Sequence, residues 1–291
     1  MAGVDLQQSL GISLPPGFFL ETAAARPDMY NSLFDPSHPM SSLWPQFITS
    51  TPISEKYWSQ LTAIPFFASY QLMILHKDVG NKHESVVACG NSIPVYCPLN
   101  DLPDGGWEAV LQSGIENYHA GHRQPPNLLS ALGVTVVPAH RQHRLADILI
   151  QALRSLASRA HFQALVVPLR PTRKSEHPMV PLEEYVHWEI DDQAHPQGRI
   201  PYDPWLRKHL AYGGQIVRIA PRSMTIAAHE DQWKDWTGCD LAVLAASSTA
   251  TSSETYVEVP IPRALVPVRY DPVSKIGSYV EPNVWVVHPM H

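Results

Sequence analysis

A basic segment between an apolar run and a regular helical pattern offers the clearest chemistry in this sequence. Residues 140–144 read His-Arg-Gln-His-Arg, and apolar residues recur at helical spacing from Leu145 onward. The first turn of a helix has unpaired N–H groups and a partial positive charge, so it can bind a phosphate. Arginine side chains can add charge-assisted hydrogen bonds to the same anion. A solvated basic turn beside an ordinary helix is the alternative interpretation.

A candidate for proton transfer lies farther along the chain. We expect a helix to begin at Asp203-Pro204, an N-cap followed by proline at the first helical position, and this helix contains His209. Histidine can exchange protons near neutral pH, although packing beside Trp205 is the alternative role for His209. Tyr212 is the next candidate, and a core position is the alternative there.

Polar residues also stand in or beside segments that are otherwise apolar. Asn91 and Ser92 fall within an expected strand, where polar side chains are disfavoured unless they form hydrogen bonds. An ionisable cluster around Glu183 and Tyr185 is a further catalytic candidate, with a solvated face as the alternative. Near the C-terminus an acid and an amide precede an apolar strand. The candidates for a substrate pocket are therefore Asn91, Ser92, Glu281, Asn283 and Trp285.

The histidines also raise the question of a metal site. His119 and His122 form a pair at helix-turn spacing, and so do His140 and His143. No cysteine or carboxylate lies at a matching interval, and a closed zinc site needs four ligands. Chance pairs are common among 15 histidines, so we expect no metal.

The elements that would position these residues alternate between strands and helices. The pattern predicts strands over 70–75 and 85–96, a helix from Trp107 to Tyr118, then the strand 128–137, the helix 145–160 and the strand 164–168. After the helix that carries His209 it predicts strands near 216–219, 256–262, 264–270 and 284–288, and a short helix over 229–236. In residues 1–60 we expect a folded extension with a helix capped by Ser54, and nothing there indicates chemistry.

Length and composition limit the class of protein. With 291 residues, of which 44% are hydrophobic and 16% charged, the chain can bury a substantial core. A net charge of −6 gives no global attraction to nucleic acid or anionic membranes. The three cysteines lack metal-type spacing, and we find neither a secretory signal nor an apolar run of the roughly 20 residues that span a bilayer. These features predict a cytoplasmic protein without a membrane or nucleic-acid partner.

The order of elements and two short motifs resemble the GNAT (GCN5-related N-acetyltransferase) superfamily. Residues 141–146 are similar to its acyl-CoA turn, Arg/Gln-x-x-Gly-x-Gly/Ala, with Arg144 in place of the central glycine. Residues 209–217 resemble its Tyr-x-x-x-Gly-Phe segment, with His209 in place of the tyrosine. C-terminal phrases, among them 281–285, look like those of a poorly characterised GNAT-like group, and this resemblance covers nearly the whole chain.

The resemblance implies an α/β (α+β) fold with a mixed, mostly antiparallel, twisted sheet flanked by helices. A single domain, 1–291, would comprise an N-terminal extension (1–65), a core with the acyl-CoA motif (66–190) and a half with acceptor-side elements (191–291). Acyl-CoA would bind at Val134, Val136, Arg141, His143, Arg144 and Ala146. His209 would act as the acid, with Tyr212, Glu183 and Tyr185 as further catalytic candidates.

The implied function is transfer of an acyl group from acyl-CoA, or from a carrier-protein thioester, to an amine of a small molecule in secondary metabolism. An acyl-carrier protein would then be a partner. Arg144 and His209 depart from the motifs, so two alternatives remain open. The fold could serve decarboxylation, cyclisation or another group transfer without CoA, or it could bind a small molecule without catalysis.

Overall fold

The computed structural model describes residues 6–77, 83–193, 198–247 and 256–290. Its main sheet has the order β1-β2-β3-β4-β5-β11-β10-β9, and β8 pairs with the other edge of β11. Among the described strands only β4 and β5 run parallel. The strands of this sheet are β1 (Phe18–Thr22), β2 (Leu72–Lys77), β3 (Glu84–Val95), β4 (Leu128–Val136), β5 (Ala164–Leu169), β8 (Gln215–His229), β9 (Val257–Val259), β10 (Val268–Asp271) and β11 (Ile276–Pro289). This mixed, mostly antiparallel sheet confirms the expected fold class.

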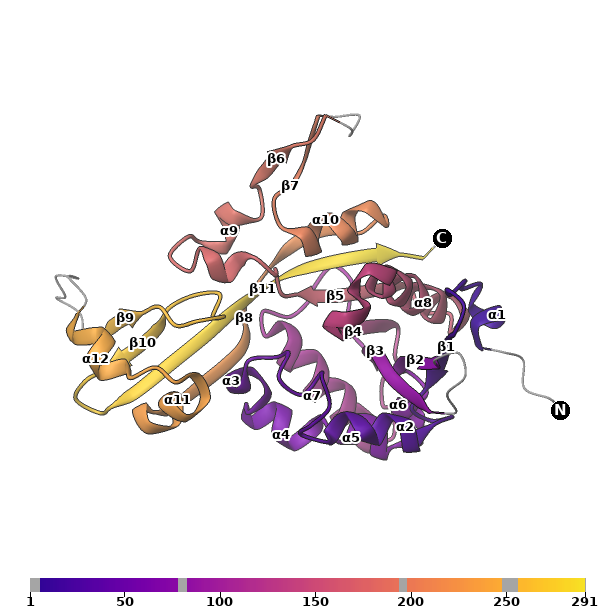
Figure 1. Ribbon diagram of the computed structural model, residues 1–291, viewed down its shortest axis with the longest axis horizontal. Helices are drawn as coiled ribbons and strands as arrows, with labels where there is room; N and C mark the ends of the chain where they lie inside the picture. Colours follow the sequence, from indigo (N-terminus) through magenta and orange to yellow (C-terminus); the bar gives the residue numbers. More distant parts are fainter. Residues whose placement is uncertain (1–5, 78–82, 194–197, 248–255, 291) are drawn as a thin grey trace.

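Helices cover both faces of the sheet (Figure 1). On one face of the sheet, Leu149 and Leu153 of α8 pack against Leu129 and Leu165. On the opposite face, α7 packs against Leu128 and Val166, because successive strand residues point to opposite sides. The helices are α1 (Leu6–Leu10), α2 (Pro27–Asn31), η1 (Ser32–Phe34), α3 (Gln46–Thr49), α4 (Pro52–Tyr57), α5 (Gln60–Ala63), α6 (Pro65–Ala68), α7 (Gly106–His119), η2 (Pro138–His143), α8 (Leu145–Arg159), η3 (Lys174–Glu176), α9 (Leu182–Tyr185), α10 (Pro204–Ala211), α11 (Glu230–Thr237) and α12 (Leu241–Ala246).

Strands β4 and β5 separate after a short stretch of pairing. The last pair in their register is Ser130↔Val166, although β4 continues to Val136 and β5 to Leu169. On its other edge β4 stays paired with β3, where a register shift leaves Leu132 as an extra residue, a β-bulge. The facing edges of the two strands therefore have backbone groups outside the ladder, and a gap opens between them.

The two longest strands carry the chain into a second lobe. The far halves of β8 and β11 meet β9, β10, α11 and α12 around a separate apolar cluster that includes Trp233, Tyr270 and Tyr279 (Figure 1). A hairpin of β6 (Glu189–Asp191) and β7 (Arg199–Pro201) projects from the body beside α9 and α10.

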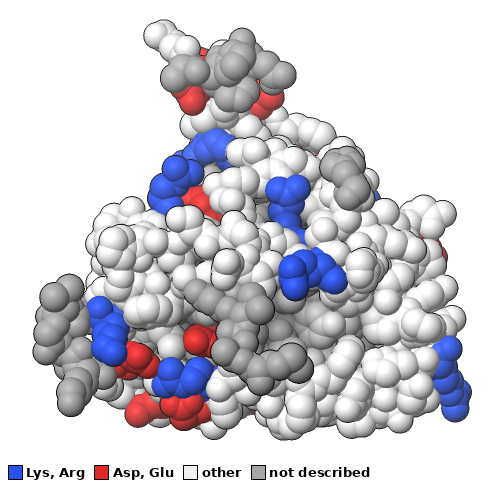
Figure 2. Space-filling view, turned by 90° about the vertical axis from the view of Figure 1, so that its right-hand side faces the viewer, with Lys and Arg blue, Asp and Glu red and all other residues white. Residues whose placement is uncertain are grey.

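The face of the molecule drawn in Figure 2 carries no continuous charged patch. On the side drawn in Figure 2, Lys and Arg lie in separate groups among uncharged atoms. Within the described ranges, none of the helices has the length and apolar character that crossing a bilayer requires.

Three local predictions need correction. Thr51, not Ser54, caps the helix near residue 54, because its side chain accepts the N–H of Ser54. The strand predicted over 216–219 continues to His229, since a register shift in the pairing with β11 accommodates Pro221, which breaks the sequence pattern. The strand predicted over 264–270 begins only at Val268. Strands β1, β6 and β7 were not predicted.

Candidate functional site

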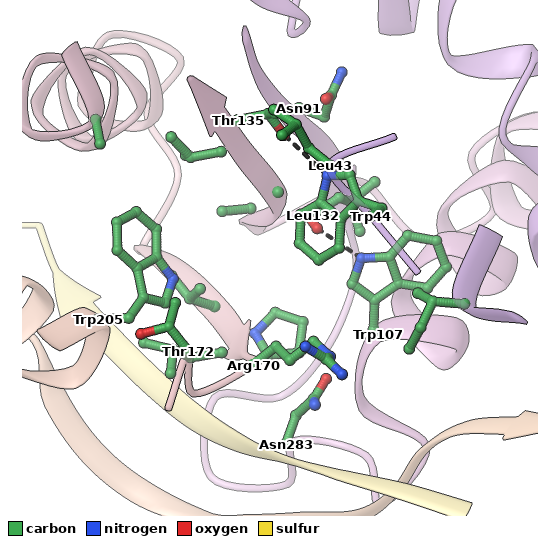
Figure 3. Close-up of a pocket in the computed structure, with 18 of the residues that line it drawn as sticks. Leu43, Trp44, Asn91, Trp107, Leu132, Thr135, Arg170, Thr172, Trp205 and Asn283 are labelled. Carbon is green, nitrogen blue, oxygen red and sulfur yellow. Dashed lines mark hydrogen bonds between the residues drawn. The ribbon is translucent and has the colours of Figure 1, made fainter. Parts of the chain in front are cut away.

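A cavity of about 940 Å³ occupies the gap between β4 and β5 and extends to the N-terminal segment 43–59. Figure 3 shows Trp205 on one side of it, Trp44 and Trp107 on the other, and Arg170 between them beside Asn283. The part that we call the α8 half is lined by Val134, Val136, Arg141, Arg144, Ala146, Asp147, Ile150, Leu153, Leu165, Val167, Trp205, Lys208 and His209. The α4 half is lined by Leu43, Trp44, Pro45, Ile48, Thr49, Ser54, Glu55, Trp58, Ser59, Trp107, Met224, Arg263 and Asn283.

The basic turn leads directly into α8 and contributes Arg141 and Arg144 to the cavity. Arg144 has φ 56° and ψ 28°, the left-handed conformation that glycine adopts most easily. The arginine therefore keeps the backbone shape that a glycine would allow, while its side chain is 76% exposed. Because the first N–H groups of a helix have no intrahelical acceptor, this turn can bind an anion through its backbone and its arginines.

An ion pair joins α8 to α10 at the wall of the α8 half. Lys208 donates hydrogen bonds from Nζ to both carboxylate oxygens of Asp147, at 2.8 and 2.9 Å. Burial opposes ionisation of Asp147, but Lys208 and Arg144 outweigh it and hold the pKa of this carboxyl below its usual value. The pair fixes the position of α10 relative to the basic turn that precedes α8.

His209 reaches the cavity from α10 and is 2% exposed. Its Nδ1 lies 2.9 Å from Nε2 of His288 in β11, and its own Nε2 is buried without a hydrogen-bond partner in the described structure. Burial lowers the pKa of His209 to about 3, and the neighbouring His288 and Lys208 add to this effect. His209 is therefore neutral at physiological pH, so the sequence-based argument from an ordinary histidine pKa is wrong.

Three tryptophans form the wall of the α4 half. Trp44 donates from Nε1 to Thr135 Oγ1 at 2.9 Å, and Trp107 donates to the carbonyl oxygen of Leu132 at 2.7 Å (Figure 3). Trp58 stacks on Trp107 with ring centroids 5.8 Å apart and an interplanar angle of 21°. These contacts attach the N-terminal segment and α7 to β4 at its bulge.

A buried ion pair lies below the cavity, and only its arginine, Arg170, reaches the lining. Arg170, just after β5, donates from Nε to both oxygens of Glu281 at 2.9 and 3.0 Å. Glu281 also accepts hydrogen bonds from Tyr279 at 2.6 Å and from Asn283 at 3.2 Å. Ser223 donates to Asn283 Oδ1 at 2.6 Å, so the network ties β5, β8 and β11 together at the point where the strands leave the core.

The structure brings together some of the residues selected from the sequence and separates others. Those that line the cavity are Asn91, Val134, Val136, Arg141, Arg144, Ala146, His209 and Asn283. The cavity lining does not include Ser92, His143, Glu183, Tyr185, Tyr212, Glu281 or Trp285. No described group of three or more His, Cys, Asp and Glu side chains is placed to hold a metal ion.

Several of the absent residues have structural contacts instead. Tyr185 donates to Asp203 at 2.9 Å, Ser92 donates to the carbonyl oxygen of Tyr70 at 2.7 Å, and Trp285 donates to that of Pro103 at 2.9 Å. Glu183 is exposed on α9. We therefore do not place these side chains at the reacting groups.

Sequence reasoning missed most of the α4 half. Residues 43–59 were expected to carry no chemistry, yet Trp44, Glu55 and Trp58 line the cavity, as do Arg170 and Arg263 from distant segments. The signal present in the sequence was the pair of tryptophans Trp44 and Trp58 in this short stretch.

Comparison with known proteins identifies the family. No family model matches the chain. The curated arginine N-acetyltransferase avaD of Aspergillus versicolor is 81% identical over 291 residues, which cover all of both chains. The loading GNATL domain of CurA from Lyngbya majuscula shares the fold, with 14% identity, a TM-score of 0.50, and coverage of 94% of this chain and 97% of that one. The GNAT-like decarboxylase GphF in complex with isobutyryl-CoA is 20% identical with a TM-score of 0.46, covering 70% of this chain and 90% of that one. The chain belongs to the family of the Aspergillus versicolor enzyme, shares its fold with the GNATL domain, and is an N-acyltransferase.

Proposed function

We propose that this enzyme transfers an acetyl group from acetyl-CoA to arginine. The acceptor and the acyl group are those in the name of the relative, and 81% identity over the full length supports assigning them to this chain. The structural observation that carries the proposal is the continuity of the cavity. It connects the cationic turn of α8, the gap between β4 and β5, and the buried His209.

The α8 half suits the donor. Arg141, Arg144 and the first N–H groups of α8 would bind the pyrophosphate, because a helix N-terminus and guanidinium groups both favour phosphate oxygens. The backbone of β4 beyond Ser130 is paired on one edge only, so its free groups would hydrogen-bond the amides of the pantetheine arm. An acetylated carrier protein would present the same arm without the nucleotide, and is the second donor to test.

His209 is the proposed proton carrier. A neutral nitrogen of arginine attacks the thioester carbonyl, a C–N bond forms, the C–S bond breaks, and the thiolate departs. The attacking nitrogen becomes strongly acidic as the bond forms, so even a weakly basic imidazole can take its proton. His209 Nε2 would accept that proton and pass it to the sulfur, while Nδ1 keeps its hydrogen bond to His288.

The test is a turnover assay with purified protein, arginine and either acetyl-CoA or an acetylated carrier protein, read as thiol release and as acetylarginine by mass spectrometry. We expect product with acetyl-CoA, and loss of about 100-fold in kcat for His209→Ala with an almost unchanged KM for acetyl-CoA. Glu183→Gln is the control, since Glu183 is exposed outside the cavity. No thiol release with the unaltered enzyme would contradict the proposal, and full kcat in His209→Ala would remove His209 from the mechanism.

A further inference from the structure

One carboxylate at the cavity stands apart from the other charged groups. Glu55 on α4 lines the α4 half, is exposed, and makes no side-chain hydrogen bond or ion pair with any described residue. The other carboxylate in the lining, Asp147, is already paired with Lys208 and Arg144. An unpaired carboxylate at the rim of a binding cavity is free to accept hydrogen bonds from a cationic ligand.

Aromatic side chains lie beside this carboxylate. Trp58 follows Glu55 by three residues, and side chains three apart on a helix share one face. Trp58 lines the cavity and stacks on Trp107, so the two indole rings form a continuous aromatic surface. The face of a tryptophan ring attracts a guanidinium group through the ring quadrupole.

The charges elsewhere in the cavity exclude other places for a cation. Apart from Glu55 and Asp147, the charged lining groups are positive: Arg141, Arg144, Arg170, Lys208 and Arg263. A guanidinium group would be repelled by these side chains. Glu55 is therefore the lining group in the described cavity that can complement the charge of a cationic acceptor.

We propose that Glu55 and the stacked pair Trp58–Trp107 form the subsite that binds the guanidinium group of the acceptor. This inference rests on the proposed function, because it takes arginine as the acceptor. Glu55 supplies charge-assisted hydrogen bonds, and the indole rings supply a flat surface for the planar cation. The subsite makes the enzyme select a guanidinium over a neutral side chain of the same shape.

Binding measurements by calorimetry test the subsite with two probes, arginine and citrulline, whose urea group has nearly the shape of guanidinium but no charge. The unaltered enzyme should bind arginine at least about 10-fold more tightly than citrulline, because only arginine can form the charge-assisted contact. Glu55→Gln should weaken arginine binding about 10-fold, whereas Glu55→Lys should abolish it. Glu183→Gln, which removes an exposed carboxylate outside the cavity, should leave both affinities unchanged.

Two results would overturn the subsite: citrulline binding the unaltered enzyme as tightly as arginine, or Glu55→Gln retaining arginine affinity within twofold. Thermal melting of each variant shows whether the fold is intact, and we expect no shift for Glu55→Gln because the side chain has no described partner. A failure of the proposed function is distinguishable, because the unaltered enzyme would then form no acetylarginine from acetyl-CoA.

Discussion

His209 and His288 are two buried rings, and Nδ1 of His209 lies 2.9 Å from Nε2 of His288. The pKa of His209 falls from 6.5 to about 3 on folding, so between these pH values the unfolded chain binds more protons than the folded one. Stability from this group is fully present above about pH 6.5 and is lost as the pH falls, by up to about 1.4 kcal/mol per pH unit. Urea titrations from about pH 7 to pH 4 should show a flatter pH dependence for His209→Gln than for the unaltered enzyme. Equal slopes would mean that His209 is not held neutral by burial.

Arg144 is the other residue whose identity departs from the family motif. Arg144→Glu should raise the KM for acetyl-CoA about 10-fold, because it places a negative charge at the proposed pyrophosphate site. Arg159→Glu makes the same charge change at the exposed C-terminal end of α8 and should leave that KM within about twofold. Steady-state kinetics with saturating arginine measures both. If both variants raised the KM equally, the effect would come from the changed net charge of the protein. The turn would then not be the phosphate site.

At the scale of elements, one side chain, Asp203, anchors the start of α10. Asp203 accepts the N–H groups of Trp205 and Leu206 through Oδ1, and its Oδ2 accepts the backbone N–H of Arg173 and the hydroxyl of Tyr185. Asp203→Ala should lower the free energy of unfolding by about 2–4 kcal/mol, because a cap is lost and buried donors become unpaired. It should also lower kcat, since α10 carries His209.

Asp203→Asn is the matched control for this anchor. It keeps an oxygen for the helix cap and should lose about half as much stability. Chemical denaturation of the two variants measures the difference. If Asp203→Ala were as stable as the unaltered enzyme, the hydrogen bonds at the start of α10 would make no net contribution to the free energy of unfolding.

The elements that could be predicted from the sequence are those whose apolar residues recur with a regular period. The strand, turn, helix and strand from β4 to β5 follow a clear apolar period, and the structure has them within one or two residues of the expected ends. The far half of β8 has no such pattern, because Pro221 and Arg222 interrupt it and much of the strand is exposed. The α4 half depends on side chains from segments far apart in the chain, and no local pattern states which of them converge.

At the scale of the whole molecule, Arg170 and Glu281 connect the core to the C-terminal lobe. Glu281 is fully buried, and β11 passes from its pairing with β5 to its pairing with β10 on either side of this residue. Glu281→Gln should lower the free energy of unfolding by about 3 kcal/mol, because it leaves the charge of Arg170 without its partner in a buried site. Urea denaturation should show this loss.

An exposed pair provides the comparison. Arg199 and Asp191 are 67% and 86% exposed, so removing that charge with Asp191→Asn should change stability by less than the measurement error. Equal effects from Glu281→Gln and Asp191→Asn would show that the core and the lobe are joined by apolar packing alone.

The attachment of residues 43–59 to β4 has a consequence for redesign. This segment reaches the sheet through hydrogen bonds and ring contacts and adds no strand to it, while the turn of α8 and His209 belong to other elements. In the proposed arrangement, Glu55 and Trp58 of this segment contact the acceptor, Trp107 of α7 completes the aromatic surface, and the donor is bound by other elements. A library confined to this short segment could retarget the enzyme to new amines while the catalytic scaffold stays untouched.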